Sequence, residues 1–158
     1  MEIHIATLKD VDKLVDVYSE WSKFKDILPA TLIESDTHGS LIKYFDGSNT
    51  TRIYLLAIDE AGISLGACYI DISFLSLNNI RLGDMVIKEK YRNRGVGSKL
   101  VEEVIIYARN NDVQKIWLWT QEELKSAIRL YEKMGFILEA RLIKQFCGKD
   151  ALQFGLVL

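Results

Sequence analysis

The feature that most constrains the fold is a glycine turn leading into an amphipathic helix, with a predicted strand on each side. The turn reads YRNRGVGS at residues 91–98. Apolar residues then recur at helical spacing through Ala108, which predicts a helix of about four turns. The flanking runs NIRLGDMVIK (79–88) and KIWLWT (115–120) are typical of strands. A strand, a crossover helix and a second strand imply a parallel strand pair inside the sheet.

The rest of the chain predicts one α+β domain over residues 1–158, with helices on both faces of a mixed, mostly antiparallel sheet. EAG at 60–62 predicts a hairpin turn in which Gly62 takes positive φ. Gly135 is expected to end the last helix as a left-handed cap. The predicted order is β-α-α-β-β-β-α-β-α-β-β, an α/β three-layer arrangement. The expected strands are 2–6, 52–59, 63–74, 79–88, 115–120, 136–146 and 151–158, and the expected helices are 10–26 with Asp10 as N-cap, 40–45, one from 96, and 122–134.

Composition narrows the class of protein. The 158 residues carry a formal net charge of −2, which argues against nucleic acid as a partner and makes a local basic cluster informative. Cys68 and Cys147 lie far apart in sequence and are expected to be reduced thiols, as in a cytosolic protein. The start MEIHIATLKD is charged and unlike a signal peptide, and no apolar run is long enough to span a membrane. We therefore expect a cytoplasmic protein with no membrane partner.

The glycine turn has the properties of an anion site. A helix N-terminus presents backbone N–H groups without carbonyl partners together with the positive end of the helix dipole, and phosphate is a natural ligand there. Gly95 and Gly97 let an anion approach closely, and Arg92, Arg94 and Lys99 add positive charge. The segment lacks the residue order of the NTPase loop and the third glycine of the dinucleotide fingerprint. A surface helix start with chance arginines stays open as the alternative.

Three segments resemble the GCN5-related N-acetyltransferase (GNAT) family. YRNRGVGS matches that family's [QR]-x-x-G-x-[GA] loop at Arg92, Gly95 and Gly97. AIRLYEKMGF at 127–136 is similar to its A-I-x-L-Y-x-K-x-G-F segment, and EIHIATLKDVDKL resembles its opening strand and helix. The resemblance covers essentially the whole chain. It implies the GNAT fold and an enzyme that transfers the acetyl group of acetyl-CoA directly to a primary amine of a small molecule or peptide.

The resemblance also implies where acetyl-CoA binds, as a co-substrate and without a metal. Main-chain N–H groups of the loop hold the pyrophosphate, and the preceding strand pairs with the pantetheine arm and orients the thioester carbonyl. The residues implied for cofactor binding are Met85, Val86, Ile87, Arg92, Asn93, Arg94, Gly95, Val96, Gly97, Ser98, Lys99, Ala127 and Tyr131.

Two residues are candidates for catalysis. The resemblance makes Tyr131 the acid that protonates the departing thiolate, and a core tyrosine with a satisfied hydroxyl is the alternative. Asp84 is the candidate base, and strand alternation points it away from Met85 and Ile87. The alternative for Asp84 is a strand-end carboxylate bonded to nearby backbone.

The chain departs from the family's pattern at three positions. Related small-amine enzymes often carry Glu where this chain has Gly83, a base where it has Trp119, and Asn where it has Leu124. Deprotonation through ordered water, assisted by Asp84 or by the glutamates at 122 and 123, is therefore the hypothesis. The departures also leave an alternative function, a CoA-binding sensor or interaction module with little turnover.

The sequence does not identify the acceptor. The family's acceptor region corresponds here to several aromatic and acidic residues, and an acidic rim suits a cationic amine, although core packing is the alternative for the aromatic rings. These residues are Trp21, Phe24, Tyr44, Trp119 and Phe146, with Cys147 and the candidate anions Asp26, Glu34, Asp36 and Asp71. A monomer or a homodimer, and acetyl or a longer acyl donor, stay open.

Overall fold

The computed structural model describes residues 1–24, 26–27, 38–47 and 51–158, and within these ranges the strands and α-helices follow the predicted order. The strands are β1 (Glu2–Ile5), β2 (Arg52–Ile58), β3 (Ser64–Asp71), β4 (Asn79–Ile87), β5 (Lys115–Thr120), β6 (Ile137–Phe146) and β7 (Lys149–Val157). The α-helices are α1 (Val11–Tyr18), α3 (His38–Phe45), α4 (Val96–Asn110) and α5 (Lys125–Lys133). Four short 3-10 helices are described: η1 (Leu8–Asp10), η2 (Ser19–Phe24), η3 (Leu75–Leu77) and η4 (Glu89–Tyr91).

The strands form one mixed sheet in the order β1-β2-β3-β4-β5-β7-β6. β4 and β5 run parallel because the α4 crossover carries the chain back across the sheet before β5 begins. The other neighbouring strands pair antiparallel. The predicted mixed, mostly antiparallel sheet is confirmed.

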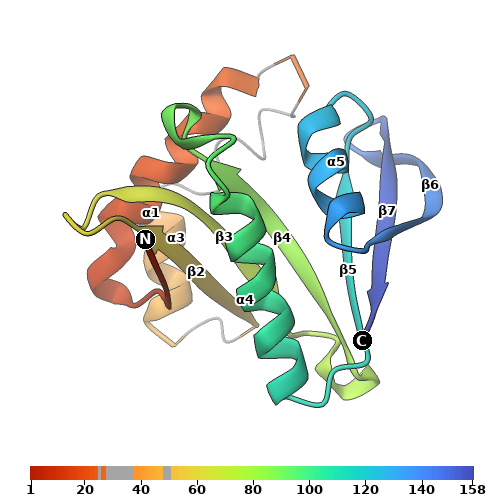
Figure 1. Cartoon of the computed structure of the whole chain (residues 1–158), viewed down its shortest axis with the longest axis horizontal. Helices are drawn as coiled ribbons and strands as arrows, with labels where there is room; N and C mark the ends of the chain where they lie inside the picture. The colour runs from red at the N-terminus through yellow and green to blue at the C-terminus, as the bar shows by residue number, and fades with distance from the viewer. Residues whose placement is uncertain (25, 28–37, 48–50) are drawn as a thin grey trace.

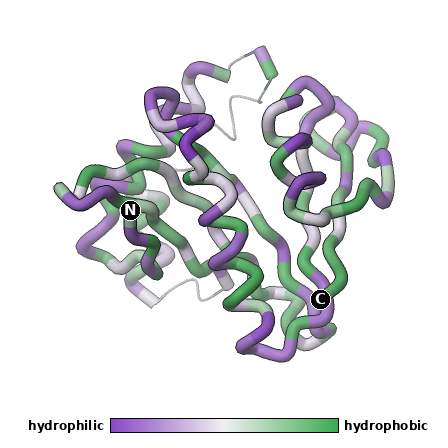
Figure 2. Tube along the Cα trace, in the orientation of Figure 1, coloured by the Kyte–Doolittle hydropathy of each residue, from purple (hydrophilic) through white to green (hydrophobic). Residues whose placement is uncertain are grey.

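Helices cover both faces of the sheet, as Figure 1 shows. On one face α4 and α5 close over a buried cluster that includes Leu100 and Tyr131. On the other face α1 and α3 pack Leu14 and Leu41 against β2, β3 and β4. In Figure 2 hydrophobic residues run along the central strands, whereas hydrophilic and hydrophobic residues alternate along α4. No helix in the described ranges is long and apolar enough to cross a bilayer.

Local signals in the sequence predicted several turns correctly. Gly62 has φ of 77° in the β2–β3 hairpin, and the carboxylate of Asp59 accepts hydrogen bonds from the backbone N–H groups of Ala61 and Ile63. Gly135 has φ of 90° after α5, and the N–H of Phe136 donates to the carbonyl of Tyr131 at 3.0 Å. This bond closes a Schellman-type cap.

The structure differs from several of the predicted element boundaries. Asp10 is the N-cap residue of α1, as predicted, but its side chain makes no cap hydrogen bond, because its carboxylate accepts from the N–H and hydroxyl of Thr7 one turn earlier. The first helix is α-helical through Tyr18 and continues as the 3-10 helix η2. The helix expected from residue 122 begins at Lys125. The last strand begins at Lys149, because Cys147 and Gly148, both at positive φ, complete the hairpin turn in two residues.

A bulge in β4 shapes the centre of the sheet. Asp84 has φ of 46°, and the pairing of β4 with β3 shifts register there. β4 pairs with β5 from Asn79 to Arg81, and no pair is formed beyond Arg81 and Trp117 along the described length of these strands. The two strands therefore diverge beyond this point (Figure 1).

Gly83, next to the bulge, has no room for a side chain. A Cβ at this position would overlap the ring of Tyr69, which lies opposite on β3. We expect Gly83→Ala to lower the free energy of unfolding by about 1–3 kcal/mol, because the buried ring must move. Gly39→Ala is the matched control, since a Cβ on this α3 residue meets nothing within 4 Å and alanine favours a helix by about 0.5–1 kcal/mol. Urea denaturation of the wild type and the two variants measures these changes. A midpoint for Gly83→Ala that is no lower than that of the wild type would show that Tyr69 moves at little cost.

Candidate active site

A cleft of about 610 Å³ opens where β4 and β5 diverge. Its walls come from β4, the glycine loop, α5 and η2. Among the predicted cofactor-binding residues, it is lined by Met85, Val86, Ile87, Arg92, Asn93, Gly95, Val96, Gly97, Ser98 and Ala127. The other predicted residues, Arg94, Lys99, Tyr131 and Asp84, are not part of its lining. The fold thus gathers ten residues from two distant segments around one cleft.

The loop backbone has the form of an anion cradle. Asn93 and Gly95 both have positive φ, at 59° and 82°, so the chain reverses twice before α4 begins. The first intrahelical bond beyond the loop runs from the N–H of Lys99 to the carbonyl of Gly95 at 3.0 Å. The N–H groups of the preceding first turn have no intrahelical acceptor, as at any helix N-terminus. They lie beside the cleft, where a bound anion would accept hydrogen bonds from them and would interact with the positive end of the helix dipole.

The two loop glycines serve different purposes. Gly95 needs its left-handed conformation, although a Cβ there would meet open space. Gly97 has no positive φ, but a Cβ there would come within 2.8 Å of the Leu130 side chain. Gly97 therefore allows the start of α4 to approach α5, which forms the facing wall of the cleft.

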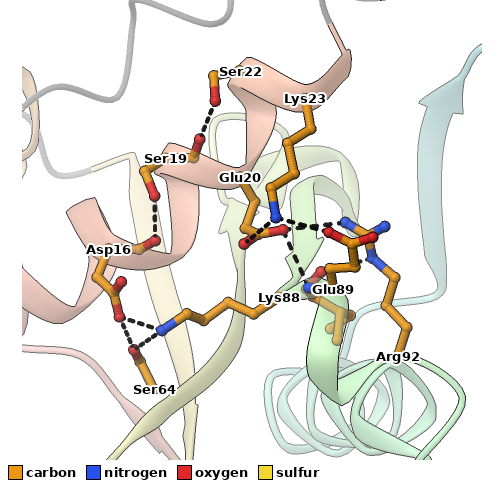
Figure 3. A network of polar contacts seen from close by, with 10 residues as sticks. Asp16, Ser19, Glu20, Ser22, Lys23, Ser64, Lys88, Glu89 and Arg92 are labelled. Atoms are coloured by element: carbon orange, nitrogen blue, oxygen red, sulfur yellow. Dashed lines mark hydrogen bonds and ion pairs between the residues drawn. The ribbon is translucent and has the colours of Figure 1, made fainter.

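Four basic residues precede the glycines of the loop, Lys88, Lys90, Arg92 and Arg94, and are called the basic cluster below. Carboxylates from the first helical segment hold two of them, Lys88 and Arg92, as Figure 3 shows. The ammonium of Lys88 bonds to the carboxylate of Asp16, which also accepts from Ser64. Arg92 donates from Nε to the carbonyl of Ile87 at 3.0 Å and lies 3.4 Å from Glu20. These two charges fasten the loop to α1 and η2.

Glu20 is the centre of this fastening (Figure 3). Its carboxylate accepts from Lys23 at 3.0 Å and from the backbone N–H of Glu89 at 3.1 Å, in addition to facing Arg92. Lys23 also pairs with the carboxylate of Glu89 at 2.9 Å. The same segment contributes Trp21 and Phe24 to the cleft wall, and the guanidinium of Arg92 lies over the Phe24 ring. These contacts hold the glycine loop against η2, which forms another wall of the cleft.

Sequence reasoning missed the positive charge on α5. Arg129 and Lys133 line the cleft beside Ser126, Leu130 and the predicted Ala127. Their spacing of four residues, one turn after Lys125, could have indicated a basic stripe on one face of the helix. Arg94 and Lys90, the remaining residues of the basic cluster, lie against the ring of Tyr91.

Tyr131 packs in the core beneath the cleft. Its side chain is 6% exposed and contacts the rings of Phe136 and Phe154. Burial, with added effects from Cys68 and Asp84, raises the pKa of the Tyr131 hydroxyl. The hydroxyl therefore holds its proton at neutral pH, as a proton donor must.

Asp84 lies in the bulge on the side of the sheet that faces α1 and α3. Removal from water raises the pKa of its carboxyl to about 6, although Arg52, Arg81 and a hydrogen bond from Tyr69 oppose the shift. Met85 and Ile87 pack into the opposite cluster under α4, whereas the hydrogen-bond partner of the Asp84 carboxyl is Tyr69, a residue of the cluster under α1 and α3. A carboxyl that titrates near pH 6 is suited to accept a proton at neutral pH.

A chain of polar contacts leads from Asp84 to the surface. The guanidinium of Arg81 donates to the hydroxyl of Tyr69 at 2.8 Å and to the carboxylate of Asp71 at 3.0 Å. Asp71, expected as a free anion on an acidic rim, is therefore paired. The Tyr69 ring occupies the space that a side chain at Gly83 would need. This packing explains why the chain has no glutamate there.

The remaining candidates are placed as follows. Leu124 lines the cleft, and Trp119 donates from its indole N–H to the amide oxygen of Gln153 at 3.3 Å. Cys68 is buried, which raises the pKa of its thiol, and Cys147 is exposed in the β6–β7 turn. Glu34 and Asp36 lie outside the described residues. No group of three or more His, Cys, Asp or Glu side chains in the described part of the chain is arranged to hold a metal ion.

Comparisons with known proteins agree with this geometry. N-alpha-acetyltransferase 30 of Xenopus laevis is 28% identical over 115 residues, which are 72% of this chain and 42% of that protein. The chain thus spans less than half the length of this relative, and about a third of the human one.

Solved structures match the whole chain. A GNAT acetyltransferase from Streptococcus pneumoniae aligns with a TM-score of 0.76 and 26% identity, covering 99% of this chain and 98% of its own. A phosphinothricin acetyltransferase from Sinorhizobium meliloti, solved in complex with AcCoA, aligns with a TM-score of 0.80 and 15% identity, covering 99% and 88%. The family model of the GNAT acetyltransferases matches residues 17–136. With the divergent strands and the glycine loop at their open end, this match shows that the chain belongs to the GNAT acetyltransferase family.

Proposed function

We propose that the protein transfers the acetyl group of acetyl-CoA directly to a primary amine of a small molecule or peptide. The observation that carries the proposal is the divergence of β4 and β5 beyond Arg81 and Trp117, with the glycine loop at the open end of the cleft. In a thioester bound between the strands, the CoA portion would lie on the α4 face of the sheet. An amine would approach the acetyl group from the other face. Membership of the GNAT family supports the same chemistry.

The cleft fits the donor in shape and in hydrogen-bonding groups. The N–H groups from Asn93 to Ser98 would hold the pyrophosphate, and Arg129 and Lys133 supply positive charge on the facing wall. The edge of β4 from Met85 to Ile87 offers backbone groups that β5 does not pair. The amide-containing pantetheine arm of CoA, lying along this edge, would form hydrogen bonds with these backbone groups as an added strand does.

Asp84 and Tyr131 are proposed to move the protons. Acetyl-CoA supplies the activated acyl group, and the attacking nitrogen must lose a proton that Asp84 accepts, directly or through water. Tyr131 would donate its proton to the departing thiolate. The two groups are in opposite protonation states at neutral pH, because Asp84 is largely ionised while Tyr131 is protonated.

A cytoplasmic location, with no nucleic-acid or membrane partner, is proposed from composition alone: the chain is slightly acidic and has two cysteines in 158 residues.

The proposed reaction releases a thiol, which is simple to measure. We expect amine-dependent thiol release from acetyl-CoA when a panel of primary amines is supplied. Tyr131→Phe should lower kcat by about 10²-fold or more, because it removes the proposed proton donor. Tight CoA binding without thiol release for any amine would reject the enzyme and favour a CoA-binding sensor.

The glycine loop and the basic cluster that precedes it should differ in their importance for CoA binding. Gly97→Val puts a branched side chain where a Cβ alone would lie 2.8 Å from Cδ2 of Leu130, so the Leu130 side chain in the cleft wall or the loop must shift. We expect the Kd for CoA to rise about tenfold or more, a change of about 1.4 kcal/mol. Lys90→Ala removes a charge that lies over the Tyr91 ring and should change Kd less than twofold, roughly the scale of an exposed charge. Isothermal titration calorimetry measures the Kd for CoA of both variants. Equal effects would show that the glycine loop binds CoA only as a charged surface does, without a specific role for its backbone.

The pH dependence of turnover tests the proposed base. Asp84 must be ionised to accept a proton, so kcat/KM should rise with pH through about 6 and level off above it. Asp84→Asn should remove this rise and lower kcat/KM by about 10²-fold or more. The profiles of both proteins are compared with one amine between pH 5 and about 8, the range in which a group near 6 titrates. An unchanged profile in the variant would exclude Asp84 as the base.

A further inference from the structure

Two arginines stand in one row across the sheet, on the face that α1 and α3 only partly cover. The register places Arg52 opposite Asp71, Asp71 opposite Arg81, and Arg81 opposite Trp117. Residues in register across neighbouring strands point to the same face. The buried cluster under α1 and α3 contains no residue of the described strands β5, β6 and β7. The row therefore passes from the covered half of this face to the half beside it.

Aromatic rings hold both guanidinium groups in place. Arg52 lies between Tyr44 and Tyr69, with its Cζ 4.8 Å and 4.4 Å from the ring centroids. Arg81 lies 5.4 Å from the ring of Trp119 and 5.8 Å from that of Trp117. Such stacking leaves the edges of a guanidinium, where its N–H donors are, available to an anion.

The two arginines differ in what balances their charge. Arg81 pairs with Asp71, which is further held by the backbone N–H of Ser73. Arg52 lies against ring faces and hydrogen-bonds to the side chain of Tyr54, and its guanidinium acts electrostatically on the carboxylate of Asp84. In the proposed reaction Asp84 takes a proton from the amine and becomes neutral. Arg52 then loses its balancing charge unless the acceptor supplies one.

We infer that Arg52, with Arg81 beside it, binds the carboxylate of an amino acid whose amine is the acetyl acceptor, which rests on the acetyl transfer proposed above. Asp84 and Arg52 together are complementary to a zwitterion: the ammonium of the ligand would face the Asp84 carboxylate, and the carboxylate of the ligand would face the Arg52 guanidinium. The position agrees, because Arg81 belongs to the last strand pair before the divergence and Asp84 lies three residues further along β4. Trp117 and Trp119 add an apolar wall beside the arginines.

The test compares amino acids with their own carboxamides. The panel is glycine, L-alanine, L-methionine, L-phenylalanine, β-alanine and γ-aminobutyrate, each beside its carboxamide, with kcat/KM taken from thiol release. For the acids that react, Arg52→Gln should lower the acid-to-amide ratio of kcat/KM by about tenfold or more relative to the wild type, the scale of a charge-assisted hydrogen bond. Comparing ratios between the two proteins cancels the different basicity of the acid and amide amines. Arg109→Gln, an exposed arginine at the far end of α4, is the matched control and should leave the ratio unchanged.

Direct binding separates the failure of this inference from the failure of the proposed function. Calorimetry of the same acids with the CoA-loaded protein should show a Kd that rises about tenfold in Arg52→Gln. Thiol release with an acid-to-amide ratio equal in wild type and Arg52→Gln overturns the inference and leaves the acetyltransferase standing. If no amine releases thiol, the proposed function fails, and the inference about Arg52 is then tested by calorimetric binding of the acids alone. Acid binding that is absent, or equal in the two proteins, then overturns the inference.

Discussion

The site depends on the strand pairing that is lost between β4 and β5. A backbone edge inside a domain must be hydrogen-bonded, so a sheet that opens in its middle needs another partner along β4. The bulge at Asp84 changes the course of β4, and pairing with β5 ends at Arg81. The α4 crossover then places a helix N-terminus at the open end of the cleft. The divergent strands and the crossover together leave an unpaired edge, which an extended ligand would complete, beside the anion cradle.

The same bulge has an electrostatic consequence. It brings a carboxyl group within reach of Tyr69, Arg52 and Arg81, where loss of water raises its pKa and the two guanidinium groups limit the rise. A group balanced in this way titrates near the pH at which an enzyme works. Tyr69 contributes twice, since its ring fills the space above Gly83 and its hydroxyl links Arg81 to Asp84. The absence of a larger residue at 83 is therefore a condition of this network.

Much of the fold could be predicted because its signals are local. The apolar spacing of α4, the turn at Gly62 and the cap at Gly135 each depend on residues within one or two turns of one another. The glycine loop was predicted for the same reason. The partners of the charged residues could not be predicted, because Asp16 and Glu20 meet Lys88 and Arg92 across 72 residues of chain. In the sequence these four residues look like two separate charged surfaces, whereas in the structure two of the positive charges near the loop, those of Lys88 and Arg92, are balanced by carboxylates.

Donor and acceptor would be recognised by different physics on the two faces of the sheet. On the α4 face the groups that would meet the proposed donor are mainly backbone N–H and C=O groups, which depend on φ and on the absence of a Cβ at Gly97. Substitution of most side chains there leaves those groups in place. On the other face the groups that would meet the proposed acceptor are side chains: two guanidinium groups, Asp84 and the tryptophans of β5. A change at Arg52 or Trp119 can therefore alter which amine is accepted without altering how the thioester is held, so acceptor choice can change while the donor site stays constant.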